Sequence, residues 1–127
     1  MNFQNYTIKS QEAIQQAQQL AQEMGHHQIE NEHIFKAIMM VDENVTPFLL
    51  KKLNINLNLF TQILDKSLES FPKVSGGDIH LSRESGKTMN EASSIAKKMG
   101  DEYVSIEHLI LAIFKSSSKV AQILKDQ

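Results

Sequence analysis

Two glutamates and two hydroxyl residues have the types and the spacing best suited to bind a ligand. Glu32 and Glu107 lie 75 residues apart, and the same 75 residues separate Thr7 from Ser82. A carboxylate binds a guanidinium through two parallel charge-assisted hydrogen bonds, and the free N–H groups at the start of a helix bind a phosphate. We expect Thr7 and Ser82 to begin helices, and the common offset pairs Thr7 with Glu32 and Ser82 with Glu107. Two such sites would match arginine or phosphoarginine on another polypeptide.

Each glutamate also has a purely structural interpretation. Both lie in the first turn of a predicted helix, where a negative charge stabilises the helix dipole by roughly 0.3–1 kcal/mol. The residues before them differ, because Asn31 precedes Glu32 and Ile106 precedes Glu107. Asn31 can donate a hydrogen bond and Ile106 cannot, so we expect the second site to be the poorer phosphate binder. The structural and the ligand-binding interpretations both remain open from these residues.

Histidines follow the glutamates and raise the question of a metal site. His33 and His108 are adjacent to the carboxylates, but neighbouring residues of a helix point roughly 100° apart, and no third ligand has suitable spacing. We therefore interpret both as packing or hydrogen-bonding residues and predict no metal site. His26 and His27 are expected to be a solvated pair in a loop.

The glutamates and histidines belong to a longer repeated pattern. The stretch "MGHHQIENEHIFKAIM" begins at Met24, and "MGDEYVSIEHLILAIF" begins 75 residues later at Met99. Eleven of the 40 residues from 10 to 49 are identical to their partners at this constant offset, with no gap. Chance would give only a few identities, so we conclude that the chain contains an internal duplication.

Each copy predicts a set of helices that positions these residues. Apolar residues at three- and four-residue steps predict helices over 8–24, 31–40, 45–53 and 56–71. Thr7 can cap the first helix and Gly25 can end it. The stretch "PKVSGGDIH" predicts a loop, after which Ser82 restarts the pattern.

The duplication predicts the fold class, because neither copy can bury its apolar side alone. Two copies should pack as an all-α, pseudo-twofold helical bundle. We predict a single domain over 1–127, with repeat one at 1–72, a loop at 73–80 and repeat two at 81–127. The second repeat stops where the first continues into its fourth helix, so we expect the chain to be a piece of a larger protein. Five methionines at apolar helical positions are expected to fill the core, with an adaptable binding surface as the alternative: Met24, Met39, Met40, Met89 and Met99.

Composition excludes several classes of function. The 127 residues carry a net charge of −2 and no cysteine, which argues against nucleic-acid or membrane partners and excludes thiolate chemistry. No apolar run approaches the ~20 residues that span a bilayer, and the start has no signal-peptide pattern, so we expect a cytoplasmic protein. No GxxxxGK(S/T) phosphate loop occurs. We therefore expect no ATPase activity from this chain. Other enzymatic activities have little support, because the sequence shows no nucleophile–base pair and no set of metal ligands.

The repeated motif resembles the Clp amino-terminal domain, the repeat domain at the front of Clp-family AAA+ ATPases. The resemblance runs from about Phe3 to Lys125. "GDEYVSIEHL" and "KVAQILKD" are most similar to ClpB-type disaggregases, and "NEHI" is similar to the "TEHI" of ClpC-type unfoldases. The ClpB-type resemblance implies a domain that receives unfolded or aggregated polypeptide and passes it to a hexameric ATP-driven pore. It implies no cofactor in this fragment and ATP in the full-length protein. Adaptor docking or phosphoarginine binding in a ClpC-type protein, or a stand-alone binding protein, are the alternatives.

The resemblance also implies roles for individual residues. Thr7, Asp101 and Glu107 match positions that ClpB-type proteins use for substrate handling. Apolar residues at the starts of segments are expected to line a groove between the repeats, with ordinary packing as the alternative: Phe3, Tyr6, Ile8, Leu81 and Ile106. Glu32 and Ser82 complete the predicted binding residues.

Overall fold

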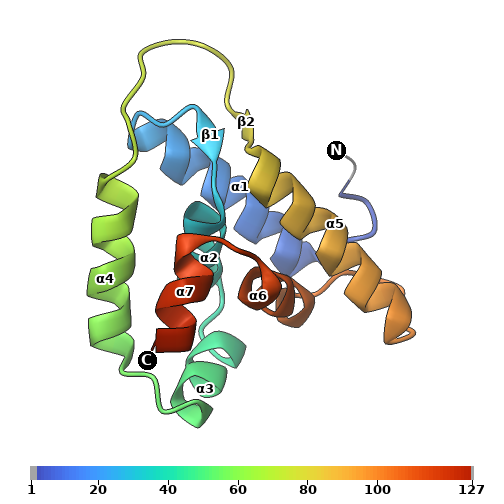
Figure 1. The fold of residues 1–127 in the computed structure, drawn as a ribbon. Coiled ribbons are helices and arrows are strands. Elements are labelled where there is room, and N and C mark those ends of the chain that lie inside the picture. Colours follow the sequence, from blue (N-terminus) through green and yellow to red (C-terminus); the bar gives the residue numbers. More distant parts are fainter. Residues whose placement is uncertain (1–2, 127) are drawn as a thin grey trace.

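Helices form nearly all of the secondary structure in residues 3–126, which are the residues that the computed structural model describes (Figure 1). The first repeat contains α1 (Ile8–Glu23), strand β1 (Gln28–Ile29), α2 (Asn31–Val41), α3 (Val45–Lys52) and α4 (Leu57–Glu69). The second repeat contains strand β2 (His80–Leu81), α5 (Arg83–Lys98), α6 (Ile106–Lys115) and α7 (Lys119–Asp126). The predicted all-α duplicated bundle is confirmed.

Matching signals begin and end the first helix of each repeat. The hydroxyl oxygen of Thr7 accepts a hydrogen bond from the Ser10 N–H, and that of Ser82 accepts one from the Ser85 N–H, both at 3.1 Å. These bonds satisfy N–H groups that have no partner within the helix. Gly25 and Gly100 follow α1 and α5 with the same φ of 76°. This left-handed conformation costs glycine little and ends the helix.

The two repeats are joined by a pair of crossed backbone contacts. The Thr7 N–H donates to the Val104 carbonyl at 3.0 Å, and the Ser82 N–H donates to the Ile29 carbonyl at 3.2 Å. The residues before them form parallel bridges, Tyr6 with Val104 and Leu81 with Ile29. Each repeat therefore starts its first helix beside the motif of the other repeat. The short strands β1 and β2, which the sequence did not predict, are one of these two contacts.

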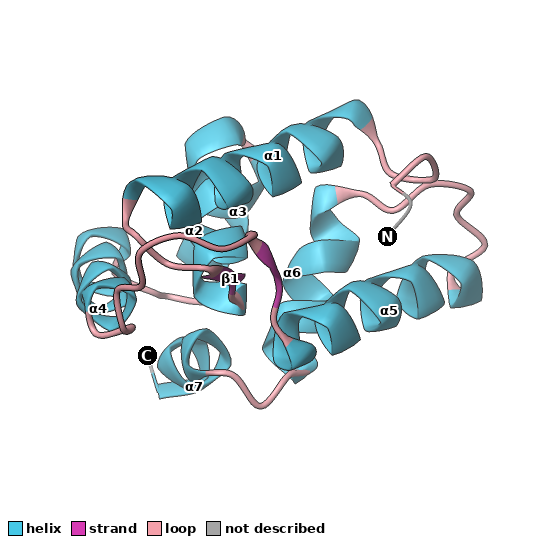
Figure 2. Cartoon of the chain, turned by 90° about the horizontal axis from the view of Figure 1, so that it is seen from above, coloured by secondary structure: helices cyan, strands magenta, loops and turns pink. Residues whose placement is uncertain are grey.

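The hydrophobic core lies between the two repeats. Its buried positions recur at the same 75-residue offset. In Figure 2, α1 and α5 lie along opposite sides of the bundle, with α6 between them. Ala21 and its counterpart Ala96 are both buried, as are Ile38 and Ile113. This confirms the prediction that equivalent positions share one core. Met89 is buried, whereas Met40 and Met99 are exposed, so the expectation that all five methionines fill the core was wrong for these two.

The helix α4 breaks the symmetry, because the described part of the second repeat contains no counterpart to it. α4 packs against α7, where Ile123 is buried. The repeat-related residue on α3, Phe48, is exposed, and so is Leu53 at the end of that helix. None of the helices within residues 3–126 has the length and apolar character needed to cross a bilayer.

The glycines give a test of the backbone conformation. We expect Gly100→Ala to lower the free energy of unfolding by ~1–2 kcal/mol, because alanine is strained in the left-handed region. Gly86→Ala is the matched control, since Gly86 lies inside α5 and a Cβ there would meet no atom within 4 Å. We expect it to raise the free energy of unfolding by up to ~1 kcal/mol. Urea unfolding of both variants measures the difference, and equal effects would contradict the assigned helix end.

Candidate functional site

The structure separates the predicted site residues into two groups. The first group lies at the start of α1 and is called the α1 site: Phe3, Tyr6, Thr7, Ile8, Asp101, Ile106 and Glu107. The second lies at the start of α5 and is called the α5 site: Glu32, Leu81 and Ser82. The crossed contacts Thr7–Val104 and Ser82–Ile29 define these groups.

The predicted pairing of Thr7 with Glu32 and of Ser82 with Glu107 is therefore wrong. α1 contains 16 residues and is about 24 Å long at 1.5 Å per residue. Thr7 begins this helix, and Glu32 follows its far end. Thr7 instead lies beside the loop that leads to Glu107, and Ser82 beside the loop that leads to Glu32. Each site thus combines a helix start from one repeat with a carboxylate from the other.

The α1 site presents an accessible carboxylate and exposed apolar side chains. Glu107 is exposed in the first turn of α6. Ile8 at the start of α1 is 76% exposed, and Met99 at the end of α5 and Tyr103, which precedes Val104, are also exposed. A pocket of about 320 Å³ lies beside them and is lined by Asn5, Ser93, Ala96, Lys97, Asp101, Glu102 and Val104. The arrangement offers both a charged and an apolar surface to a ligand.

Most of the apolar residues predicted to line a groove are packed instead. Tyr6 and Ile106 belong to the hydrophobic core. The Tyr6 hydroxyl donates to the Met89 carbonyl at 3.4 Å, and the Phe3 ring meets the Tyr6 ring edge-on at 5.1 Å. Phe3 and Leu81 are partly buried against the core. Among the five predicted apolar residues, only Ile8 is exposed.

Met99 and Tyr103 are the apolar residues that the sequence analysis missed at this site. Met99 has the spacing of a core residue, and nothing in the sequence shows that it faces away from the core. Tyr103 precedes Val104 in a loop with no periodic pattern. The exposure of both residues is evident only in the tertiary structure.

The α5 site has no accessible carboxylate. Glu32 is only 3% exposed, and its Oε2 accepts a hydrogen bond of 2.7 Å from the Val120 N–H at the start of α7. Burial raises the pKa of Glu32, and the bond from Val120 opposes that shift. The two glutamates therefore occupy equivalent positions in the sequence but different environments.

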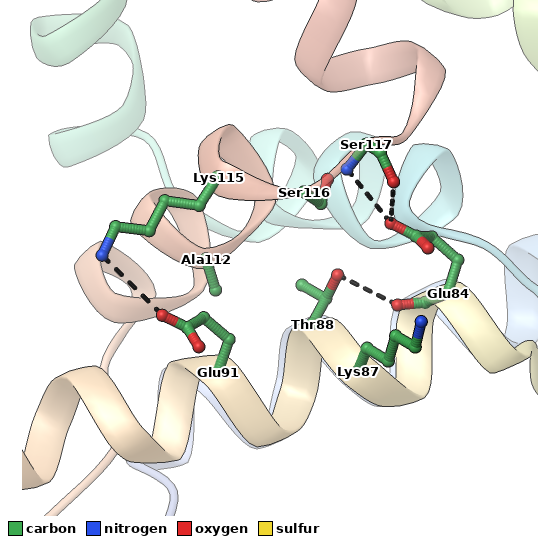
Figure 3. A pocket seen from close by; sticks show the side chains of 8 residues that line it. All are labelled: Glu84, Lys87, Thr88, Glu91, Ala112, Lys115, Ser116 and Ser117. Carbon is green, nitrogen blue, oxygen red and sulfur yellow. Dashed lines mark hydrogen bonds and ion pairs between the residues drawn. The ribbon is translucent and has the colours of Figure 1, made fainter.

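A polar pocket of about 410 Å³ lies next to the α5 site, between α5 and the α6–α7 connection (Figure 3). Its lining is Glu84, Lys87, Thr88, Glu91, Ala112, Lys115, Ser116 and Ser117. Glu84 accepts hydrogen bonds from the N–H and the hydroxyl of Ser117, at 3.1 and 3.2 Å. Lys115 and Glu91 form an ion pair at 3.7 Å. Both glutamates of this pocket are thus already engaged by the protein.

The histidines that follow the glutamates form internal helix caps. Nδ1 of His33 accepts from the Glu30 N–H at 2.9 Å, so its Nε2 carries the proton and donates to Nδ1 of His26 at 2.8 Å. In the second repeat, His108 accepts from the Ser105 N–H in the same way, and its Nε2 lies 2.8 Å from Asp101. Both histidines are therefore hydrogen-bonded to the backbone and to a second side chain.

His26 is the counterpart of Asp101, and its environment corrects a prediction. His26 is only 4% exposed, whereas it was expected to be solvated. The loop folds so that His26 meets the ring of Phe71 edge-on, while His33 stacks on the same ring. Burial and then the neighbouring His26 lower the pKa of His33 from its ordinary 6.5 to about 4. Burial, with Lys73 second, also lowers the pKa of His26.

This histidine pair predicts a loss of stability in mild acid. The unfolded chain binds a proton at His33 near pH 6.5, but the folded chain does so only near pH 4. Stability is therefore complete above pH 6.5 and falls between about pH 6.5 and 4, by roughly 1.4 kcal/mol per pH unit for this one group. Denaturant unfolding across this range measures the slope.

The second repeat suggests the matched variant for that experiment. His26→Asp gives His33 the carboxylate partner that His108 already has. The pKa of His33 should then rise, because a nearby negative charge favours the imidazolium. We expect the His33 contribution to the pH slope to disappear in this variant. A slope that is equal in the parent and in His26→Asp would contradict the assignment to this pair.

Comparison with known proteins places these features in a family. The family of the Clp repeat (R) N-terminal domain matches residues 5–127. Chaperone protein ClpB of Bacteroides thetaiotaomicron is 50% identical over 126 residues, which make up 99% of this chain and 15% of that protein. ClpB of Porphyromonas gingivalis is 43% identical, with the same two coverages. The chain thus spans about 15% of the length of these relatives.

Solved structures show the same fold at lower sequence identity. The Hsp104 N-terminal domain from Candida albicans superposes with a TM-score of 0.87 at 22% identity, covering 97% of this chain and 81% of that one. The N-terminal domain of ClpD from Arabidopsis thaliana gives a TM-score of 0.78 at 17% identity, covering 99% of this chain and 86% of that one. At these identities the likeness concerns the fold alone.

Proposed function

Because the chain belongs to the Clp repeat N-terminal domain family, we propose that it receives unfolded or aggregated polypeptide for a ClpB-type chaperone and passes it to an ATPase ring. The 50% identity to a ClpB chaperone supports the type of protein. The chain itself contains no GxxxxGK(S/T) motif, so ATP binding and the hexameric ring would belong to the remainder of a full-length protein. The cytoplasm is the compartment that we propose for it.

The accessible carboxylate of the α1 site is the observation that carries this proposal. Glu107 is exposed, and so are Ile8 at the start of α1, Met99 at the end of α5 and Tyr103 in the loop that leads to Glu107. An unfolded polypeptide exposes apolar and basic side chains together, and this surface offers a partner to each. Methionine suits such a surface because its flexible, polarisable side chain adapts to different ligands. Few side chains take part, so we expect weak binding of many sequences.

Phosphoarginine on the client is a second candidate ligand at the same place. Glu107 offers a carboxylate for the guanidinium, and the adjoining start of α1 has N–H groups that lack partners within the helix. Two features limit the phosphate part of this site. The hydroxyl of Thr7 is already bonded to Ser10, and Ile106 supplies no hydroxyl beside Glu107.

An NMR titration with an unfolded polypeptide, such as reduced and carboxymethylated lactalbumin, tests the proposal. We expect amide shifts at Ile8, Met99, Tyr103 and Glu107. Glu107→Ala should weaken binding about 5- to 10-fold, which corresponds to the loss of one charge-assisted contact of ~1–1.4 kcal/mol. Glu23→Ala is the matched control, because Glu23 is an exposed glutamate at the opposite end of α1.

The same titration distinguishes the outcomes. Equal weakening by Glu107→Ala and Glu23→Ala would show a general charge effect and reject the α1 site. Shifts confined to the polar helix faces would reject it as well. A parallel titration with free phosphoarginine tests the second candidate, and an unchanged spectrum would remove it.

A further inference from the structure

The two repeats begin their equivalent helices α3 and α7 in different ways. Asp42 lies before α3 and caps it alone. Its Oδ1 accepts from the N–H groups of Asn44 and Val45, both at 3.1 Å, and its Oδ2 accepts from the N–H and the hydroxyl of Thr46, both at 2.7 Å. A single adjacent carboxylate therefore satisfies the start of α3.

Ser117 is the repeat counterpart of Asp42 and does not cap α7. Its N–H and its hydroxyl both donate to Oε1 of Glu84 (Figure 3). Ser118 accepts from the Ala121 N–H at a long 3.4 Å. The Val120 N–H, which corresponds to that of Val45, instead donates to Glu32 at 2.7 Å. Glu32 belongs to the other repeat and lies 88 residues away along the chain.

We propose that residue 117 is the positioning residue that decides which of the two repeat-related glutamates is open to ligands. Ser117 does not bond to the start of α7, and the one local bond there, from Ala121 to Ser118, leaves the Val120 N–H without a local partner. Glu32 accepts from that N–H and is closed to other partners. Asp42 caps α3 locally, so Glu107 has no equivalent duty and remains exposed. Ligand binding by the exposed carboxylate rests on the proposed function. The capping role of Glu32 does not depend on it.

Electrostatics gives the direction of the effect at Glu32. A buried carboxylate is costly unless it is hydrogen-bonded or paired with a cation. Val120 supplies the bond, while the nearby Glu30 and Glu84 disfavour the charged form. If α7 acquired a cap of its own, Glu32 would lose its partner. It would then favour a guanidinium, the group that pairs best with a carboxylate.

Substitutions at Ser117, which is exposed, test this inference directly. Ser117→Asn adds a good helix-capping side chain and avoids placing a second negative charge against Glu84. Ser117→Ala is the matched control, since it also loses the bond to Glu84 but cannot cap. Glu32→Ala is introduced into the parent chain, the Ser117→Asn variant and the Ser117→Ala variant. Hydrogen exchange of the Val120 amide is then measured by NMR in each chain with and without Glu32→Ala. Glu32→Gln serves as the conservative variant, because its side-chain oxygen still accepts a hydrogen bond.

The exchange rates have definite expected values. In the parent chain, Glu32→Ala should accelerate exchange at Val120 about 10- to 100-fold, and Glu32→Gln should restore most of the protection. In the Ser117→Asn background, Glu32→Ala should change the rate less than about 3-fold, whereas in Ser117→Ala it should act as in the parent. Equal acceleration in Ser117→Asn and Ser117→Ala would overturn the role of residue 117. No acceleration in the parent would overturn the role of Glu32 as a cap.

A second measurement tests the availability of the carboxylate. Titration with N-acetyl-arginine methylamide should shift amides near Glu107 in the parent chain, and near both Glu107 and Glu32 in Ser117→Asn. N-acetyl-lysine methylamide is the control for charge alone. Shifts only near Glu107 in Ser117→Asn would overturn the claim that residue 117 sets the number of open sites. If neither chain binds the arginine probe, the proposed arginine-binding role of Glu107 fails, and hydrogen exchange still decides the capping role of Glu32.

Discussion

The crossed backbone contacts between the repeats determine the rest of this structure. Two hydrogen bonds place the start of each repeat against the motif of the other: the Thr7 N–H donates to the Val104 carbonyl, and the Ser82 N–H donates to the Ile29 carbonyl. Buried backbone N–H and C=O groups require hydrogen-bond partners. These two bonds supply partners to backbone groups at segment ends, which have no partner within a helix. They also position the two candidate sites. The α1 site exists because Thr7 lies beside the loop that leads to Glu107, and the α5 site exists because Ser82 lies beside the loop that leads to Glu32.

The sequence predicted the local elements well, because local signals determine them. Thr7 and Ser82 cap their helices, Gly25 and Gly100 end them, and the equivalent core positions are buried. The sequence could not predict how the repeats pair. A constant offset relates Thr7 to Ser82 and Glu32 to Glu107, but it does not say which members of these pairs meet in space.

The sequence also could not predict which side chains at the two sites are buried. Tyr6 and His26 have residue types that are common on surfaces, and each is buried because another segment covers it. Met99 has the spacing of a core residue and is exposed. The histidines show the same limit. His33 and His108 make the same bond to the backbone, but their second partners, His26 and Asp101, differ in charge. Identical residues at identical offsets therefore have second partners of different charge.

The crossed contacts also bear on how such a chain could arise. A contact in which residue i of one copy meets residue j of the other, and j meets i, is the isologous contact of a twofold dimer. A single ancestral repeat could make the same two contacts by pairing with a second copy of itself. Joining the copies through the segment between α4 and β2 would preserve the interface and remove the requirement that the two halves be identical. Gene fusion of this kind frees one partner of a symmetric pair to change alone, and Asp42 and Ser117 now differ at equivalent positions of the two halves.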